Sequence, residues 1–112
     1  MLISSKVLNG INGIAEIPGD KSISHRSIMI PCITNGVSQI TNILKSSDVM
    51  NTINAFKLMG VQIEDTKEGI TIYGKGLNSL SKPVKNIDLG NSGTSARLLI
   101  GLLSAQNFKT HL

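Results

Sequence analysis

From Ser46 to Ile72 the chain reads SSDVMNTINAFKLMGVQIEDTKEGITI, and this stretch decides the fold. The run Ser46-Ser47-Asp48 offers a capping residue and an early acid that suits the positive end of the helix dipole. An apolar stripe at helical spacing follows and consists of Val49, Ile53 and Phe56. Gly60 is suited to end the helix. We therefore predict a helix that packs its apolar stripe into a core.

A hairpin is expected directly after this helix. Val61 and Ile63 indicate one strand, the run Lys67-Glu68-Gly69 a turn, and Ile70 and Ile72 a second strand. On the other side of the helix, apolar and polar residues alternate from Val37 to Ile43, which predicts a short strand.

The amino-terminal part begins with extended pieces and continues into a helix. Residues 2–17 contain the turn-prone pairs Asn9-Gly10 and Asn12-Gly13, and Pro18-Gly19-Asp20 should end any strand. Either Ser22 or Ser24 is a suitable cap for the helix that follows, which should end before Asn35-Gly36. Pro31 costs about 3 kcal/mol inside a helix, so we expect a kink or a shortened helix.

The carboxy-terminal part is expected to be a loop, a brief strand and a helix. Residues 75–85 are loop-like, Ile87 and Leu89 suggest the strand, and the run from Ala96 to Ala105 is strongly apolar. Helices and hairpins in this order predict an α/β (α+β) fold. The last residues carry no terminating signal, so we expect a longer parent protein.

Composition limits the possible classes of protein. The 112 residues have the length of one domain, and their net charge of +4 favours anionic partners. No apolar run approaches the ~20 residues of a membrane span, and no secretory leader is recognisable, so we expect a cytoplasmic protein. The few aromatic residues are not interleaved with basic ones, which favours small anions over nucleic acid.

Cysteine and histidine give little support to a metal site or a disulfide. Cys32 is the single cysteine and lies in the apolar run IMIPCI, where we expect a buried structural thiol. His25 and His111 are too far apart in the sequence for a convincing metal site. We predict no metal and no other cofactor.

Residues 19–27, GDKSISHRS, join a glycine turn to a helix start. The free N–H groups of such a start favour an anion. Ser22 and Arg26 share one helical face, and Lys21 lies at the same end, so a hydroxyl, a guanidinium and an ammonium can clamp a phosphate. A capped helix with solvated charges is the alternative. A nucleotide P-loop is excluded because Asp20 replaces the glycine that must precede its Lys-Ser pair.

Residues 89–97, LGNSGTSAR, form a second glycine-containing turn before a helix. The small residues of this turn allow a ligand to approach the backbone closely, and Thr94 or Ser95 could cap the helix. Arg97 lies one turn beyond Gly93 and could reach back to an anion. A generic turn with a structural arginine is the alternative.

Two further residues border these motifs. Asp48 is a possible acid beside a ligand, although a role in helix capping is a sufficient explanation. His25 follows Lys21 by one helical turn and could border a site, but we expect a histidine on the surface.

Taken together, PGDKSISHRS at 18–27 and LGNSGTSAR at 89–97 strongly resemble the two signature regions of one enzyme family. It is the 5-enolpyruvylshikimate-3-phosphate synthase family, also called 3-phosphoshikimate 1-carboxyvinyltransferase. The resemblance covers essentially the whole chain and implies a fold of βαβαββ-type units. It also implies that residues 1–112 are an amino-terminal fragment of the first domain. Residues 1–17 would be a strand region that packs with a missing carboxy-terminal domain.

The resemblance also implies a reaction and its binding residues. Enolpyruvyl is transferred from phosphoenolpyruvate to the 5-hydroxyl of shikimate 3-phosphate, and phosphate is released, for aromatic amino-acid biosynthesis. Lys21 would be catalytic and contact phosphoenolpyruvate, while Ser22 and Arg26 would hold shikimate 3-phosphate. Gly93 would line the phosphoenolpyruvate pocket, and the substrate-binding loop would be shaped by Asn91, Thr94 and Arg97. No metal, nucleic acid or membrane is implied, and the fragment alone is expected to be inactive.

Two other functions compete with this interpretation. A sister enolpyruvyl transferase acts on UDP-N-acetylglucosamine, but its lysine motif normally continues with Asn-Ala, so Ser22 and Arg26 argue against it. The second alternative is a non-catalytic module that binds anions or nucleic acid.

Overall fold

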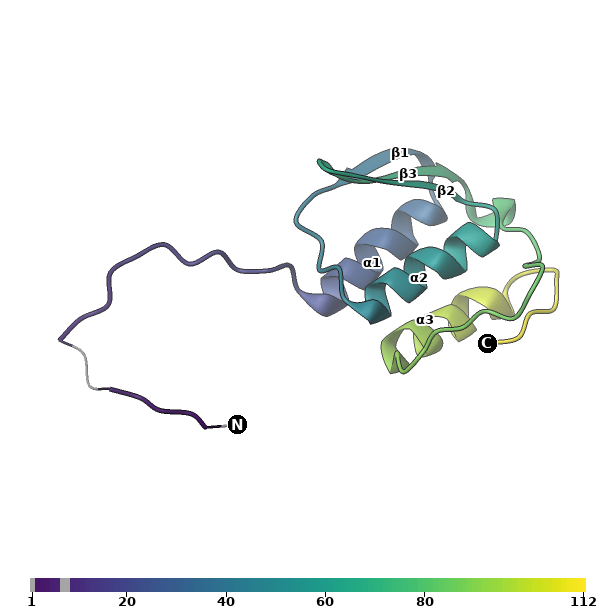
Figure 1. Cartoon of the computed structure of the whole chain (residues 1–112). Coiled ribbons are helices and arrows are strands. Elements are labelled where there is room, and N and C mark those ends of the chain that lie inside the picture. The colour runs from purple at the N-terminus through teal and green to yellow at the C-terminus, as the bar shows by residue number, and fades with distance from the viewer. Residues whose placement is uncertain (1, 7–8) are drawn as a thin grey trace.

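The computed structural model describes residues 2–6 and 9–112 and arranges them in layers (Figure 1). The antiparallel sheet forms the first layer, α1 and α2 lie beneath it, and α3 lies on their side away from the sheet. The elements are α1 (Lys21–Cys32), β1 (Asn35–Ile40), α2 (Ser47–Leu58), β2 (Gln62–Thr66), β3 (Gly69–Lys75), the 3-10 helix η1 (Leu77–Ser79) and α3 (Gly93–Ser104). This mixture of helices and sheet confirms the predicted α/β (α+β) class.

The sheet has the strand order β1-β3-β2, and both of its pairings are antiparallel. β2 and β3 form the predicted hairpin, in which Ile63 lies opposite Ile72. The strand predicted from Val37 to Ile43 is also present, but it begins at Asn35 and ends at Ile40. It ends early because the chain turns at Asn42, whose φ of 53° lies in the left-handed region.

Helix α2 agrees with the sequence prediction at both ends. The Ser46 hydroxyl accepts a hydrogen bond from the Val49 N–H at 3.4 Å, and Gly60 has the left-handed φ of 89° typical of a residue after a helix. The predicted apolar stripe is buried and consists of Val49, Ile53 and Phe56. Ile53 and Phe56 join one core with the inward residues of the sheet and of α1 and α3.

Helix α1 begins earlier than predicted. Its cap is Asp20, whose carboxylate accepts from the Ile23 N–H at 2.8 Å, so neither Ser22 nor Ser24 caps it. The Ser24 hydroxyl instead accepts from the Leu44 N–H at 3.0 Å, which ties the helix to the segment before α2. The helix ends at Cys32, one residue after Pro31. Of the two expected effects of the proline, a kink or a shortened helix, this agrees with the second.

Helix α3 also begins earlier than predicted, at Gly93, and runs through Gly101. Its cap is Ser92, which accepts from the Ser95 N–H at 3.2 Å, so the expectation that Thr94 or Ser95 caps the helix was wrong. Ser92 was overlooked because several serines and threonines crowd this turn, and each is a competent cap.

Two expected strands are missing from the described chain. Ile87 and Leu89 lie in irregular backbone, although both side chains are buried, and the Ile87 N–H donates to the His111 carbonyl at 2.9 Å. Residues 2–6 and 9–17 form no strand either, and their segment leads away from the layers in Figure 1. The remaining part of that prediction, at residues 1, 7 and 8, lies outside the described residues. Packing of residues 1–17 with another domain stays a prediction.

Burial confirms one further prediction about a single residue. Cys32 is inaccessible to solvent and lies in the core beside Ile28 and Met29. None of the helices in the described part of the chain is long and apolar enough to cross a membrane.

Candidate functional site

The amino-terminal ends of α1, α2 and α3 lie at the same end of the molecule (Figure 1). Each helix is capped by an acceptor side chain, which is Asp20, Ser46 or Ser92. Aligned peptide dipoles place about half a positive charge at each helix start. Because the positive ends of these helices are neighbours, this end of the molecule favours an anion.

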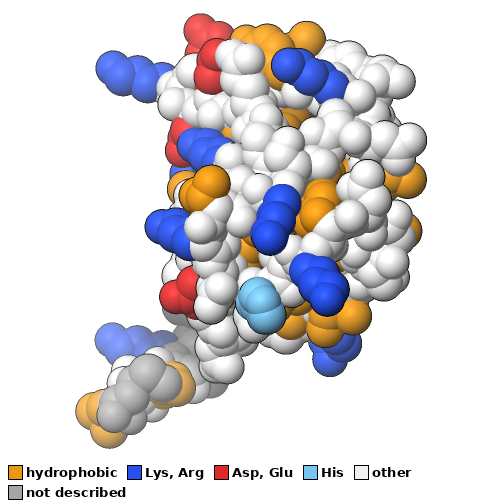
Figure 2. Space-filling view, turned by 90° about the vertical axis from the view of Figure 1, so that its right-hand side faces the viewer, with side chains coloured by type: hydrophobic (Ala, Val, Ile, Leu, Met, Phe, Trp, Pro, Cys, Tyr) orange, Lys and Arg blue, Asp and Glu red, His pale blue; other side chains and the backbone are white. Residues whose placement is uncertain are grey.

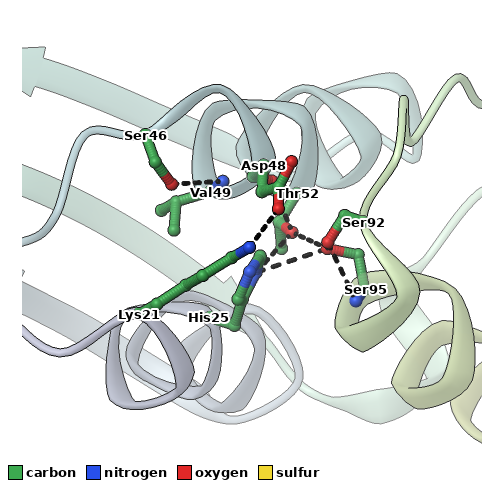
Figure 3. Close-up of polar contacts among 8 residues, drawn as sticks. All are labelled: Lys21, His25, Ser46, Asp48, Val49, Thr52, Ser92 and Ser95. Carbon is green, nitrogen blue, oxygen red and sulfur yellow. Dashed lines mark hydrogen bonds and ion pairs between the residues drawn. The ribbon is translucent and has the colours of Figure 1, made fainter. Parts of the chain in front are cut away.

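Lys21, the first residue of α1, reaches across to α2. Its ammonium forms an ion pair with the Asp48 carboxylate in the first turn of α2 (Figure 3). The Lys21 side chain is 49% exposed and that of Asp48 is 18% exposed. Asp48 therefore does not cap α2, which Ser46 does, but holds the ammonium between the two helix starts.

Ser22 and Arg26 share one face of α1, as the sequence predicts. A guanidinium N–H of Arg26 donates to the backbone carbonyl of Ser22 at 3.1 Å, and both residues are exposed. This bond uses one of the five N–H donors of the guanidinium, so the others remain for an anion near the helix start.

The second motif surrounds the start of α3. Asn91 and Arg97 are exposed and Thr94 is half-buried. A Cβ atom added to Gly93 would meet nothing within 4 Å, so open space lies above the first residue of the helix. Asn91 and Gly93 line a surface pocket of about 500 Å³, which the side chains of Lys21, Ser22 and Arg26 do not line.

A buried polar cluster connects the two motifs, and sequence reasoning missed it. We define the helix-start cluster as His25, Thr52, Ser92 and Ser95 (Figure 3). The Thr52 hydroxyl lies 2.9 Å from His25 Nδ1 and 2.7 Å from the Ser95 hydroxyl. The Ser95 hydroxyl is also 2.7 Å from that of Ser92 and 3.3 Å from His25 Nδ1.

The prediction that His25 lies on the surface was therefore wrong, because its side chain is 0% exposed. The position of Thr52 in α2 is a signal that could have revealed the cluster. Thr52 lies next to Ile53 on the buried face of the helix, where the other residues are apolar. A polar side chain that enters a core requires a hydrogen-bond partner.

Burial lowers the pKa of His25, and the positive charge of Lys21 acts in the same direction. The Asp48 carboxylate opposes this shift, and Arg26 adds to it. His25 is consequently a neutral imidazole at pH 7.

The family follows from a comparison with known proteins. Residues 6–112 match the family model described as EPSP synthase (3-phosphoshikimate 1-carboxyvinyltransferase). The chain belongs to the EPSP synthase family. A 3-phosphoshikimate 1-carboxyvinyltransferase of Ruthia magnifica is 51% identical over 107 residues, which are 96% of this chain and 25% of the relative. One from Lactococcus lactis is 53% identical over 103 residues, or 92% of this chain and 24% of the relative.

A solved structure supports the same family assignment. The EPSP synthase of Acinetobacter baumannii superposes with a TM-score of 0.83 at 48% identity, over 88% of this chain and 22% of that protein. The chain thus spans about a quarter of the length of the EPSP synthase relatives that it matches.

Among the described residues, no three side chains of His, Cys, Asp or Glu are grouped so that they could hold a metal ion. Apart from the Asp20 and Asp48 carboxylates, the site offers ammonium, guanidinium, hydroxyl and backbone N–H groups. These are donors, and their common ligand is an anion.

Proposed function

We propose that the protein transfers the enolpyruvyl group of phosphoenolpyruvate to the 5-hydroxyl of shikimate 3-phosphate and releases phosphate. The observation that carries the proposal is the shared position of the helix starts, together with Lys21 between them. Membership of the EPSP synthase family supports the same reaction. Residues 1–112 would form the amino-terminal part of the first domain, and the missing carboxy-terminal domain would complete the site.

The reaction proceeds by addition and elimination in this proposal. The 5-hydroxyl oxygen attacks C2 of phosphoenolpyruvate and gives up its proton to a base, while C3 takes up a proton from an acid. Loss of a proton from C3 then restores the double bond as the C2–O bond to phosphate breaks. In this proposal, the acid and base that move these protons belong to the carboxy-terminal domain and not to residues 1–112. No metal or cofactor is required for this balance.

Lys21 has the role of stabilising the charge of phosphoenolpyruvate. Half of the Lys21 side chain is exposed, and a pair of this kind contributes about 0–1 kcal/mol. An arriving phosphate or carboxylate therefore competes readily for the ammonium. Because phosphates and carboxylates converge during the reaction, a positioned cation lowers the energy of the transition state.

Ser22 and Arg26 would bind the phosphate of shikimate 3-phosphate. Their common face on α1 and the contact between the Arg26 guanidinium and the Ser22 carbonyl place both at the helix start. Backbone N–H groups at the start of α1 would add to the positive potential there. On α3, Gly93 would let phosphoenolpyruvate approach the backbone, with Asn91, Thr94 and Arg97 shaping the loop.

Binding to the intact gene product tests the proposal. Arg26→Ala should weaken the affinity for shikimate 3-phosphate by tenfold or more, because a hydrogen bond to a charged group contributes about 1.5–3 kcal/mol. Lys67→Ala removes a cation from the exposed turn between β2 and β3 and serves as the matched control. Titration calorimetry should show wild-type affinity for this control. Equal affinity of wild type and Arg26→Ala would contradict the assigned clamp.

The same titration separates the alternative functions. Binding of UDP-N-acetylglucosamine in place of shikimate 3-phosphate would favour the sister enzyme. A nucleic-acid module would instead bind oligonucleotides with an affinity that falls steeply with salt. Figure 2 shows the end of the molecule away from the helix starts, and on this face the lysine and arginine side chains are spread among other residues and form no continuous stripe for a nucleic-acid backbone.

Turnover provides a second test. The 112-residue chain alone should release no phosphate from phosphoenolpyruvate and shikimate 3-phosphate. The intact gene product should release it, and Lys21→Ala should slow the release roughly 10²-fold or more if this cation stabilises the transition state. Phosphate release by the isolated chain would show that the site is complete without further sequence.

A further inference from the structure

His25 connects helices that carry the binding groups but are distant in the sequence. It lies on α1, and its Nδ1 atom contacts Thr52 of α2 at 2.9 Å and Ser95 of α3 at 3.3 Å. The Thr52 and Ser95 hydroxyls also contact each other, at 2.7 Å, so the three side chains close a triangle (Figure 3). The helix starts are therefore linked by hydrogen bonds as well as by apolar packing.

Each corner of this triangle is adjacent to a residue of the proposed binding site or, for Thr52, to the ion-pair partner of Lys21. His25 follows Lys21 by one helical turn and immediately precedes Arg26. Thr52 follows Asp48 by one turn and donates to its carbonyl at 3.3 Å. Ser95 of α3, the third corner, directly follows Thr94. A displacement at any corner would thus move a group that faces the anion.

We propose that His25 is a positioning residue that holds the amino-terminal ends of α1, α2 and α3 in the arrangement that binds the substrate anions. The inference rests on the proposed function, because the anions concerned are shikimate 3-phosphate and phosphoenolpyruvate. His25 does not touch these ligands, and it acts through Lys21, Arg26 and the start of α3.

The hydrogen-bond network indicates which form of His25 performs this role. The Thr52 hydroxyl donates to the Asp48 carbonyl, so its oxygen can accept a hydrogen bond from an Nδ1–H of His25. Nε2 is buried and has no partner among the described residues. A buried lone pair without a partner is better tolerated than a buried N–H without one, which assigns the proton to Nδ1.

Protonation of His25 would disturb the arrangement. It would create a second buried N–H, at Nε2, and a positive charge beside Lys21 and Arg26 on α1. Asp48 of α2 offers partial compensation, whereas α3 faces the ring with the uncharged Ser95 hydroxyl. Burial and the Lys21 charge lower the pKa of His25, so the neutral form persists to mildly acidic pH.

Two variants of the intact gene product test the proposal. His25→Asn retains an N–H donor near the position of Nδ1 and does not titrate, whereas His25→Leu removes the donor. Calorimetry at pH 7.5 should show that His25→Leu binds shikimate 3-phosphate at least tenfold more weakly than wild type. His25→Asn should remain within about threefold, because the donor is retained. His111→Asn changes an exposed histidine outside the site and is the matched control.

The pH profile distinguishes positioning from a purely structural role. The ligand phosphate itself titrates near pH 6, so the informative quantity is the ratio of wild-type to His25→Asn affinity. This ratio should stay constant near neutral pH and fall severalfold once the pH drops through the lowered pKa of His25, while the ratio of wild type to His111→Asn stays constant throughout. The pH profile of His25→Asn remains decisive if His25→Leu does not fold.

The outcomes separate this inference from the proposed function. Absence of shikimate 3-phosphate binding by wild type would overturn the proposed function, and the inference with it. Wild-type binding, together with an unchanged affinity of folded His25→Leu or a constant wild-type to His25→Asn ratio, would overturn the positioning role alone.

Discussion

The thiol of Cys32 is buried in the core, and burial raises its pKa to about 12. Only a minute fraction is thiolate at neutral pH, and the thiolate is the reactive form. We expect a maleimide reagent to leave the native chain unmodified at pH 7 and to label it stoichiometrically in denaturant. Since Cys32 is the single cysteine, mass spectrometry gives the extent directly. Rapid labelling under native conditions would contradict the burial.

At Gly93, the first residue of α3, a substitution should affect stability and ligand affinity differently. A Cβ atom meets no neighbour there, and alanine is the better helix former by up to about 1 kcal/mol. Gly93→Ala should therefore leave the free energy of unfolding unchanged or slightly raised. The same methyl group would occupy the space proposed for phosphoenolpyruvate, so its affinity should fall about tenfold, or ~1.4 kcal/mol.

Denaturant unfolding and ligand titration check both halves of this prediction. Gly101→Ala, in the exposed middle of α3, adds a methyl group that also meets nothing within 4 Å. It serves as the control and should leave ligand affinity unchanged. Unaltered phosphoenolpyruvate affinity in Gly93→Ala would argue that the ligand does not approach this backbone.

At the scale of the element, the cap of α1 combines structural and electrostatic effects. Asp20→Ala removes the acceptor for the Ile23 N–H and should cost about 1 kcal/mol of stability. Asp20→Asn retains a cap of similar strength but removes a negative charge from the proposed anion site. We expect it to bind shikimate 3-phosphate two- to threefold more tightly at low salt, an effect of roughly 0.5 kcal/mol.

Salt dependence provides the check on the Asp20 variants. The gain in Asp20→Asn should shrink between 0.05 M and 0.5 M salt, because the Debye length falls well below the ~10 Å found at 0.1 M. Thermal unfolding of the two variants supplies the stability comparison. A cap loss in Asp20→Asn equal to that in Asp20→Ala would show that the amide does not replace the carboxylate.

Individual elements differ in how well the sequence predicts them. Helix α2 and the β2–β3 hairpin follow from local periodicity and from turn residues, and both are present. The starts of α1 and α3 were placed too late, because several neighbouring residues are equally good caps. Ile87 and Leu89 do enter the core, but the backbone between them has no strand partner in the described chain.

For the whole molecule, His25 makes stability depend on pH. Its pKa in the folded chain lies below the ordinary value of 6.5, so the unfolded chain binds a proton more readily. The stabilising contribution is fully present above pH 6.5 and is lost as the pH falls through the lower pKa of the folded state. We expect the melting temperature of wild type to fall between pH 7.5 and pH 5 more steeply than that of His25→Asn.

The comparison isolates the contribution of His25, because the two proteins differ only at this residue. Calorimetric or circular-dichroism melts at closely spaced pH values provide the measurement. Parallel curves of melting temperature against pH for wild type and His25→Asn would indicate a solvated His25 in the folded state. This result would contradict the burial of His25.

Local sequence determined the class of the fold, the α2 stripe, the hairpin and the two motifs that carry the anion-binding groups. Each of these depends on residues within one element or turn, where side-chain periodicity reports the buried face directly. The tertiary structure alone decided that Lys21 pairs with Asp48 and that His25 is buried against Thr52 and Ser95. These contacts join residues that are 27 or 70 positions apart in the sequence. They depend on how the helices pack together, which no local pattern encodes.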